Sequence, residues 1–401
     1  MIRTFQHYDL RDRNTFRMKV YCRTFIEYDS EDDLTELDSA LLPSPDEHIG
    51  GGSNSIGQRG DYRGLSPEND IGGGSDSIGN MAPLKHIGGG SNPIRNTARL
   101  KHIGGGSNLL FTGDFPGTVL HSAIRHIEVI SDSDDEVLVR VGAGVEFDKL
   151  CEWAAGRSLW GPENLSHIPG EAGAAAVQNI GAYGVEAKDI IREVRAFDLV
   201  SRKFLTFSVE ECNYGYRDSF FKSPEGKDRY IITGIVFAFR RNGSPILEYG
   251  NLRETLLSRC PCPTPSDVRE TIISIRRTKL PEVGEVGSAG SFFKNPVVSR
   301  EVFGNVVRIS GRDEASVPHY PVPGPGGEPW VKIPAAWLID QCGWKGAVRG
   351  GAGVWPSQPL VIINASGEAS PEEILALEEC IRMSVSDRFG IVLSPEVEHI
   401  Q

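Results

Sequence analysis

The chain has 401 residues and a formal net charge of -12, which predicts two or three packed domains and offers no basic surface to a nucleic acid. Its most apolar run, residues 230–239, is too short to span a bilayer, and the first residues lack the apolar stretch of a signal peptide. Seven cysteines without metal-ligand spacing are typical of reduced thiols. We therefore expect a cytoplasmic protein without a metal site.

Helix and strand signals alternate along the chain. Residues 30–42 predict a first helix, because Ser30 can act as its N-cap with Asp33 three residues later. Residues 370–390 predict a last helix, with Ser370 as N-cap and Gly390 after the final turn. Between them we expect strands at 136–144, 203–209 and 230–239 and a helix at 147–156. This alternation favours an α/β or α+β fold.

Between residues 49 and 102 the sequence is rich in Gly, Ser and Asn, and it repeats a short glycine motif. The letters HIGGGSN begin at His86 and again at His102, and variants begin at Ile49 and Ile71. Such a composition predicts a solvated loop. Consecutive glycines let backbone N–H groups converge on an anion, although a flexible turn explains them equally well. The motif is neither a P-loop nor a Rossmann fingerprint, since no Lys-Ser/Thr follows and Leu109 stands where the latter needs glycine.

A second cluster, IPGEAGAAAVQNIGAYG at residues 168–184, is more specific. Its small residues indicate a backbone that another group approaches closely, and Gln178, Asn179 and Tyr183 add directed hydrogen-bonding groups. Close packing of a helix on a strand explains the alanines but not the QNIGAYG letters.

Three later stretches supply chemistry together: YGYRDSFFK (214–222), GSAGSFFKNP (287–296) and LSPEVEHI (393–400). Taken singly, Arg217 is typical of a surface ion pair, Ser291 of a turn, and Glu396 of a solvated strand end. As a set they provide a fixed cation, a hydroxyl that carries a proton, and a carboxylate. Addition of hydride to a polarised alkene requires such groups, to stabilise an enolate and to protonate the carbanion carbon.

These stretches, together with GGGSNLLF, RRTKLP and AAWLIDQCGWKG, resemble in type and order the UDP-N-acetylenolpyruvoylglucosamine reductases, flavoenzymes of bacterial peptidoglycan synthesis. The resemblance runs from about Asn14 to the C-terminus and is interrupted by the repeated segment. It implies an α+β architecture: a PCMH-type FAD-binding fold of two α/β subdomains, plus a C-terminal α+β substrate-binding domain. The expected bounds are 1–115 with a loop insertion at 49–102, then 116–265, then 266–401.

The resemblance also implies an activity. NADPH reduces FAD, and the flavin passes hydride to the enolpyruvyl group of a UDP-sugar, which gives UDP-N-acetylmuramate for cell-wall biogenesis, and so for cell shape and cell division. A cytoplasmic monomer with no metal, nucleic-acid or membrane partner is expected.

Site residues are carried over by motif. Ser291 is the expected proton donor, with Arg217 and Glu396 stabilising the enolate. The residues expected to hold FAD are Gly104, Gly105, Gly106, Ser107, Asn108, Leu109, Pro169, Gly170, Gly173, Ala174, Gln178, Asn179, Gly181, Tyr183 and Gly184. Those expected to contact the UDP-sugar are Tyr216, Tyr249, Lys279, Asn295, Gln341 and Tyr320, the last on the extra loop of the type I enzymes.

Two departures and two alternatives remain at this stage. Residues 174–176 are all alanine where many relatives have Ser-Ser-Pro, so hydroxyl contacts to the flavin are lost there. The glycine loop occurs four times, and we expect the last copy, 104–108, to be functional because the apolar letters LLF follow it; the first copy has the better upstream context. The alternatives are another FAD-dependent oxidoreductase of the same fold and a non-catalytic nucleotide-sugar binding protein.

Overall fold

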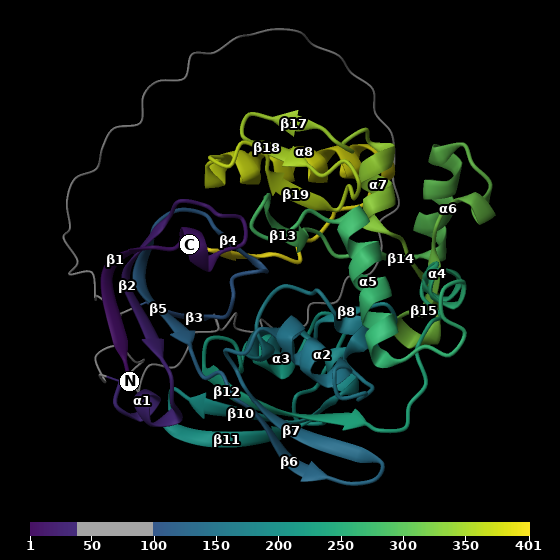
Figure 1. The fold of residues 1–401 in the computed structure, drawn as a ribbon. Helices are drawn as coiled ribbons and strands as arrows, with labels where there is room; N and C mark the ends of the chain where they lie inside the picture. Colours follow the sequence, from purple (N-terminus) through teal and green to yellow (C-terminus); the bar gives the residue numbers. More distant parts are fainter. Residues whose placement is uncertain (38–98) are drawn as a thin grey trace, which may run out of the picture. The chain divides into compact units, whose positions relative to one another are not determined.

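The computed structural model describes residues 1–37 and 99–401. Most of the predicted insertion therefore lies outside the described residues, and its character as a loop stays a prediction. The described part contains four sheets of three or more strands, and helices pack against the second sheet and the C-terminal sheets (Figure 1). No helix among the described residues is long and apolar enough to cross a membrane.

The first sheet has the strand order β1-β2-β5-β3. It consists of β1 (Arg3–Asp9), β2 (Tyr21–Tyr28), β5 (Phe115–Ser122) and β3 (Leu100–Ile103). The strands β2 and β3 both pair with β5 in parallel, whereas β1 and β2 are antiparallel. Two predicted bounds are wrong here, because the strand β3 occupies the end of the supposed insertion 49–102 and the boundary at 115/116 cuts β5. Backbone pairing with β5, which the loop composition did not reveal, fixes residues 100–102.

The first predicted helix is present as α1 (Glu31–Thr35), where Ser30 and Asp33 form a capping box. It ends before the predicted residue 42, and the remainder of that range from residue 38 onward lies outside the described part.

The second sheet is antiparallel, with the order β11-β10-β12-β7-β6. Its strands are β6 (Ile127–Asp132), β7 (Glu136–Gly142), β10 (Ile191–Asp198), β11 (Lys203–Ser208) and β12 (Tyr230–Arg240). The helices α2 (Phe147–Ala155) and α3 (Ala172–Gln178) pack on one face, and a short hairpin of β8 (Gly181–Ala182) and β9 (Val185–Glu186) follows α3. The predicted strands at 136–144, 203–209 and 230–239 and the helix at 147–156 are confirmed.

The C-terminal part is built on two small sheets. One has the order β13-β19-β18-β17 and the other β14-β16-β15. Their strands are β13 (Gly287–Ser291), β14 (Val297–Ser299), β15 (Tyr320–Pro323), β16 (Pro329–Lys332), β17 (Val348–Arg349), β18 (Ala352–Val354) and β19 (Val361–Asn364). They are accompanied by α6 (Arg300–Ser310), α7 (Ala335–Gln341) and α8 (Pro371–Phe389). The helix α8 is the predicted last helix, and its capping box of Ser370 and Glu373 and its left-handed Gly390 are confirmed.

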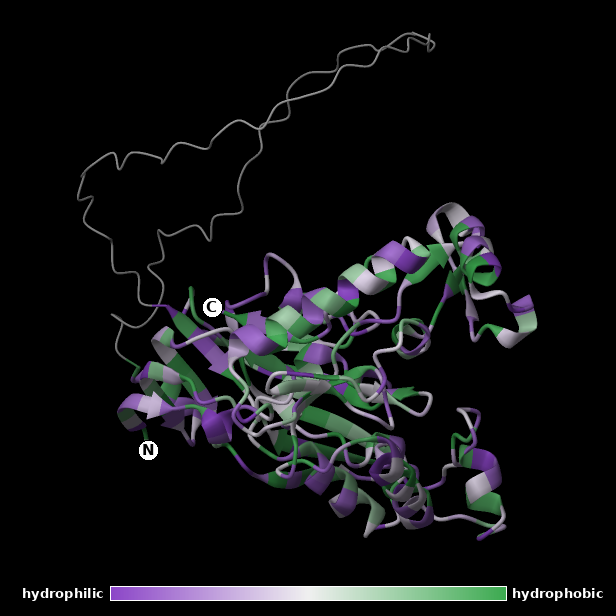
Figure 2. Cartoon of the chain, turned by 90° about the horizontal axis from the view of Figure 1, so that it is seen from above, coloured by the Kyte–Doolittle hydropathy of each residue, from purple (hydrophilic) through white to green (hydrophobic). Residues whose placement is uncertain are grey.

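The first sheet and the C-terminal part share one hydrophobic core, which includes Phe16, Phe25, Phe292 and Phe303. The apolar residues gather on strands in the interior in Figure 2. The last strand, β20 (Glu398–Ile400), pairs in parallel with β4 (Leu109–Phe111), directly after the glycine loop. The C-terminus is therefore part of the same site region as residues 104–108.

Helices α4 (Leu252–Leu257) and α5 (Pro265–Lys279) bury apolar side chains against each other in a separate cluster that also contacts Trp160 and Tyr183. A capping box of Thr264 and Asp267 begins α5. The predicted domain boundary at 265/266 falls at the start of α5. However, α5 packs against α2, which lies in the second predicted domain, 116–265.

Candidate active site

The glycine loop, residues 104–108, joins β3 to β4. Gly106 has φ +66°, and a Cβ at this position would lie 2.1 Å from the Arg13 carbonyl oxygen, so only glycine fits. The Ser107 hydroxyl donates to the Pro169 carbonyl at 2.9 Å, which ties the loop to the second motif. Among the described residues, no acceptor pairs with the backbone N–H groups of residues 105–108. Consecutive free N–H groups are the arrangement that binds a phosphate or another anion.

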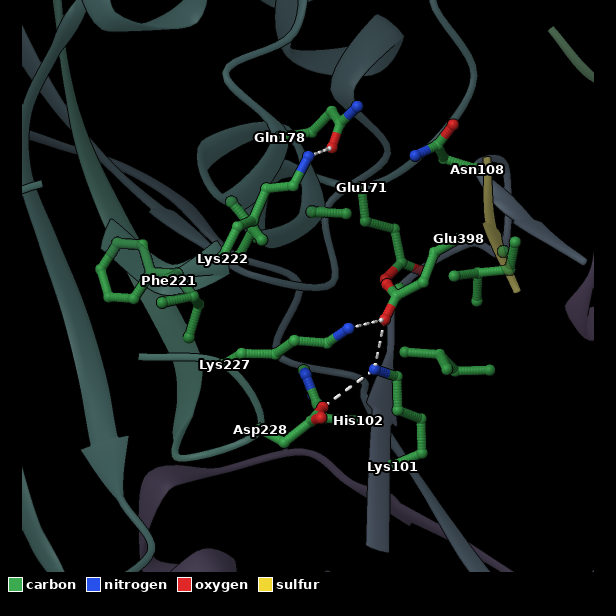
Figure 3. A pocket seen from close by; sticks show the side chains of 18 of the residues that line it. Lys101, His102, Asn108, Glu171, Gln178, Phe221, Lys222, Lys227, Asp228 and Glu398 are labelled. Carbon is green, nitrogen blue, oxygen red and sulfur yellow. Dashed lines mark hydrogen bonds and ion pairs between the residues drawn. The ribbon is translucent and has the colours of Figure 1, made fainter. Parts of the chain in front are cut away.

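A cleft of about 360 Å³ opens beside this loop, and Figure 3 shows polar side chains that line it. Its wall combines the glycine loop, α3, β12 and the C-terminal segment, with apolar contributions from Leu199, Ile231 and Ile232. An anion-binding loop next to apolar walls fits a flavin dinucleotide. Eight residues predicted to hold FAD line it: Gly104, Gly106, Ser107, Asn108, Leu109, Gly173, Ala174 and Gln178.

The remaining predicted FAD residues lie behind or beside the cleft. Gly105 packs on Gly170, since a Cβ on Gly105 would be 3.4 Å from the Gly170 Cα, and Pro169 receives the Ser107 hydroxyl. Asn179 is fully buried; its side chain donates to Gly215 and Glu186. The other three residues adjoin the later motifs: Gly181 accepts from Arg217, Tyr183 packs edge-on against Tyr249, and Gly184 lies near Ile246.

The alanine run has one partly exposed member on the cleft side. Ala174 lines the cleft, whereas Ala175 and Ala176 are buried against the second sheet. Loss of hydroxyl groups relative to Ser-Ser-Pro therefore affects the cleft surface at position 174 only.

Arg217 forms an ion pair with Glu396, which lines the cleft. The Arg217 Nε lies 2.8 Å from the Glu396 Oε1, and both side chains are largely buried. The Arg217 Nη2 donates to the Gly181 carbonyl at 2.7 Å and Nη1 to the Asn179 carbonyl at 3.5 Å. The guanidinium is thus fixed on three sides, as a site that stabilises developing negative charge requires.

Ser291 ends β13, and two residues later Phe293 forms an isolated bridge with Pro395, the neighbour of Glu396. The Glu396 backbone N–H donates a hydrogen bond to the carbonyl of Phe292 at 2.8 Å. Phe292 directly follows Ser291, so this hydrogen bond holds the backbone of Glu396 next to that of Ser291. Ser291 is exposed and follows Gly290, whose φ of +69° turns the chain there. The structure therefore brings all three predicted catalytic residues to one region.

Three of the predicted substrate residues are half-exposed tyrosines in one neighbourhood. Lys332 pairs with Tyr320 across β15 and β16, and its Nζ lies 4.2 Å from the centre of the Tyr216 ring. Burial raises the pKa of Tyr249, with Tyr320 adding to the effect. Tyr216, Tyr249 and Tyr320 have relative exposures of 42%, 56% and 55%, so they can close on a ligand.

Of the other substrate predictions, Asn295 forms a side-chain hydrogen bond with Tyr216. Asn295 accepts from the backbone N–H of Ala335 and so fixes the start of α7. Lys279 is exposed at the end of α5, and the Gln341 carbonyl accepts from Arg388. No described contact joins Lys279 or Gln341 to the tyrosines, and their roles stay predictions.

Sequence reasoning missed several polar residues of the cleft. Lys222 bonds Gln178, and Lys101 bonds both Asp228 and Glu398 (Figure 3). Buried His121 contacts Glu171, which lines the cleft beside the glycine loop. The stretch YGYRDSFFK contained Lys222, but nothing in the letters showed that its side chain points toward residue 178.

Comparison with known proteins decides the family. A reductase of Bacteroides fragilis, a UDP-N-acetylenolpyruvoylglucosamine reductase, is 40% identical over 396 residues, covering 98% of this chain and 99% of that protein. The chain belongs to the UDP-N-acetylenolpyruvoylglucosamine reductase family. Members from Porphyromonas gingivalis and Neisseria meningitidis are each 42% identical, covering 73% and 72% of this chain and 83% and 81% of their own lengths.

Family models and a solved structure agree with this assignment. The C-terminal domain of UDP-N-acetylenolpyruvoylglucosamine reductase matches residues 282–400, and an FAD binding domain matches residues 87–201. The reductase structure from Thermus caldophilus has a TM-score of 0.58 and 19% identity, covering 100% of this chain and 99% of that one, and supports the fold. The predicted family, α+β fold class and FAD cofactor are confirmed.

Proposed function

We propose that this chain catalyses the NADPH-dependent reduction of UDP-N-acetylenolpyruvoylglucosamine to UDP-N-acetylmuramate, a step of peptidoglycan precursor synthesis. The observation that supports the site assignment is the Arg217–Glu396 pair at 2.8 Å, since Glu396 lines the same cleft as the glycine loop. Hydride transfer from NADPH to the enolpyruvyl double bond is the chemistry that bound FAD supplies.

The chain's own residues would bind the cofactor, stabilise the enolate and supply the proton. The free N–H groups of residues 105–108 would hold the FAD diphosphate, and Gln178 and Ala174 would border the flavin. Arg217 stabilises the enolate that develops on the substrate carboxylate side with its positive charge, and Glu396 contributes by holding the guanidinium in place before reaction. Ser291 gives its hydroxyl proton to the carbanion carbon.

The half-exposed Tyr216, Tyr249 and Tyr320 would close over the UDP-sugar, with Lys332 among them to face a negative group such as a phosphate. We also propose a cytoplasmic location. All seven cysteines are free, as expected of thiols in a reducing compartment.

The substitution Ser291→Ala tests the assignment. Reduction of the flavin by NADPH should remain nearly normal, while reoxidation by the UDP-sugar slows about 10² to 10⁴-fold, the usual loss for one positioned general acid. Stopped-flow absorbance of the flavin measures the two half-reactions separately. Unchanged reoxidation would assign the proton to another donor, and a preparation that does not reconstitute with FAD would contradict the function itself.

A further inference from the structure

Lys222 ends the short 3-10 helix formed by Phe220–Lys222, and its side chain enters the cleft from the side opposite the glycine loop (Figure 3). Its Nζ lies 2.6 Å from the Gln178 Oε1 and 2.7 Å from the Arg217 carbonyl oxygen. Both partners belong to the site described above, yet Lys222 has no role in it so far.

The first contact decides which way the Gln178 amide points. An ammonium group only donates hydrogen bonds, so the amide atom that faces Lys222 must be the oxygen. The amide nitrogen therefore faces the Glu396 Oε1, at 3.4 Å. The Glu396 carboxylate favours the same orientation through a long contact, and the 2.6 Å bond from Lys222 is the shorter of the two that hold the amide.

The second contact holds Arg217 itself. Arg217 has φ +54°, a left-handed conformation that residues with a side chain rarely adopt. The Lys222 ammonium binds the carbonyl of this residue, and the Arg217 guanidinium binds Glu396. Lys222 thus reaches Glu396 along two routes, through Gln178 and through Arg217.

The surroundings of Lys222 disfavour the charge of its ammonium group. Burial, and next the nearby Lys294, lower the pKa of Lys222, whereas Asp218, Glu396 and Glu398 partly oppose this effect. A half-buried ammonium with two short bonds is typical of a residue that positions a site.

We propose that Lys222 is a positioning residue of this enzyme, which sets the Gln178 amide and the Arg217 backbone so that the Gln178 amide nitrogen and the Arg217 guanidinium both donate to Glu396. The inference rests on the proposed role of Glu396 in the reduction of the UDP-sugar. Lys222 itself touches no reacting atom in this assignment. Its loss should therefore slow the step that uses Glu396 and spare the one that does not.

The primary test is Lys222→Met in the FAD-loaded enzyme, with Lys222→Arg as the conservative variant and Lys203→Met, an exposed lysine on β11, as matched control. Lys222→Met should slow flavin reoxidation by the UDP-sugar about 10²-fold, the cost of a small misplacement of a catalytic group, with flavin reduction by NADPH within about threefold of normal. Lys222→Arg should recover most of the rate. Equal slowing of both half-reactions, or normal reoxidation, would overturn the proposal.

Coupling to Glu396 separates this inference from the proposed function. If Glu396→Gln alone leaves reoxidation unchanged, the assigned role of Glu396 fails. If Glu396→Gln slows reoxidation, then adding Lys222→Met should cost much less than it does in the natural chain, because both changes damage one unit. Fully multiplicative losses would show that Lys222 acts elsewhere. Should Lys222→Met not fold, Gln178→Leu breaks the same link, and normal reoxidation in that variant would contradict the proposal.

Discussion

Two deletions that differ by four residues test how the repeated segment joins the first sheet. Removal of 49–98 keeps Arg99 and the whole of β3. Removal of 49–102, the insertion predicted from the letters, joins His48 to Ile103, so that the sequence Asp46-Glu47-His48 replaces Leu100-Lys101-His102 in the strand. The longer deletion restores the family's order of motifs but not the chemistry of the strand.

The cost of the longer deletion follows from the contacts of β3. The Lys101 Nζ lies 2.9 Å from Asp228 and 2.8 Å from Glu398, and Glu47 would face both carboxylates instead. Asp228 and Glu398 are 50% and 35% exposed, so solvent screens each pair. The deletion removes two attractions, from Lys101 to the two carboxylates, and adds two repulsions, from Glu47 to the same carboxylates. Each contributes up to about 1 kcal/mol, so we expect the free energy of unfolding to fall by roughly 2 to 4 kcal/mol. Relief of a long loop returns only about 0.6 kcal/mol for each halving of its length.

Flavin absorbance of the purified proteins and their melting temperatures measure the outcome. The 49–98 deletion should bind FAD and melt like the full chain, and the 49–102 deletion should lose flavin and melt about 4 °C or more lower. Asp46→Leu with Glu47→Lys in the longer deletion restores the letters LKH and should recover both. Equal behaviour of the two deletions, or no recovery, would refute the reasoning from β3.

Other predictions concern the loop copy and pH. Bulky residues at Gly105 and Gly106 should weaken FAD binding about 10² to 10⁴-fold, since the loss of two charged hydrogen bonds costs about 3 to 6 kcal/mol. The same changes at Gly51 and Gly52, or at Gly89 and Gly90, should leave FAD binding unchanged. Titration of the apo-protein with FAD measures both, and weaker binding only in the variants of the earlier copies would contradict the choice of the last copy. Burial lowers the pKa of His102 from 6.5 to about 3, so on acidification the unfolded chain binds this proton at a higher pH than the folded chain does. The free energy of unfolding should therefore fall as the pH drops from 6.5 to 3, by up to about 1.4 kcal/mol per pH unit. His102→Gln should flatten that slope, and an unchanged dependence of melting temperature on pH would contradict the assignment.

Local signals in the sequence predicted the local structure well. The capping boxes at Ser30 and Ser370 depend on a serine and an acidic residue three positions later, so both can be read from the letters. The strand at β7 and the helix α2 follow from periodicity in the same way. Motif spacing and family resemblance then gave the three candidate catalytic residues, which the structure brings to one region.

Long-range pairing explains what the sequence did not predict. Residues 100–102 look like the end of a polar loop, and only the parallel register with β5 makes them a strand. The contacts of the Asn179 amide to Gly215 and Glu186 likewise depend on the fold, and its expected contact with FAD stays a prediction. The direction of Lys222 depends on the fold around Gln178, which lies 44 positions away in the chain.

The segment that ends in the C-terminal strand β20 links the glycine loop to the candidate catalytic carboxylate. The Asn108 side chain donates to the Glu396 carbonyl at 3.2 Å, and the Asn108 carbonyl accepts from the Glu398 N–H at 2.9 Å. The last residue of the glycine loop therefore fixes the backbone at the carbonyl of the candidate catalytic Glu396 and at the N–H of Glu398. A copy of the loop can do this only if a strand able to pair with β20 follows it, as the letters LLF do after Asn108. The residues Ser55 and Gly57 that follow the first copy, one polar and the other without a side chain, do not meet that requirement. For this reason the fourth copy can serve the cofactor and position Glu396 at the same time.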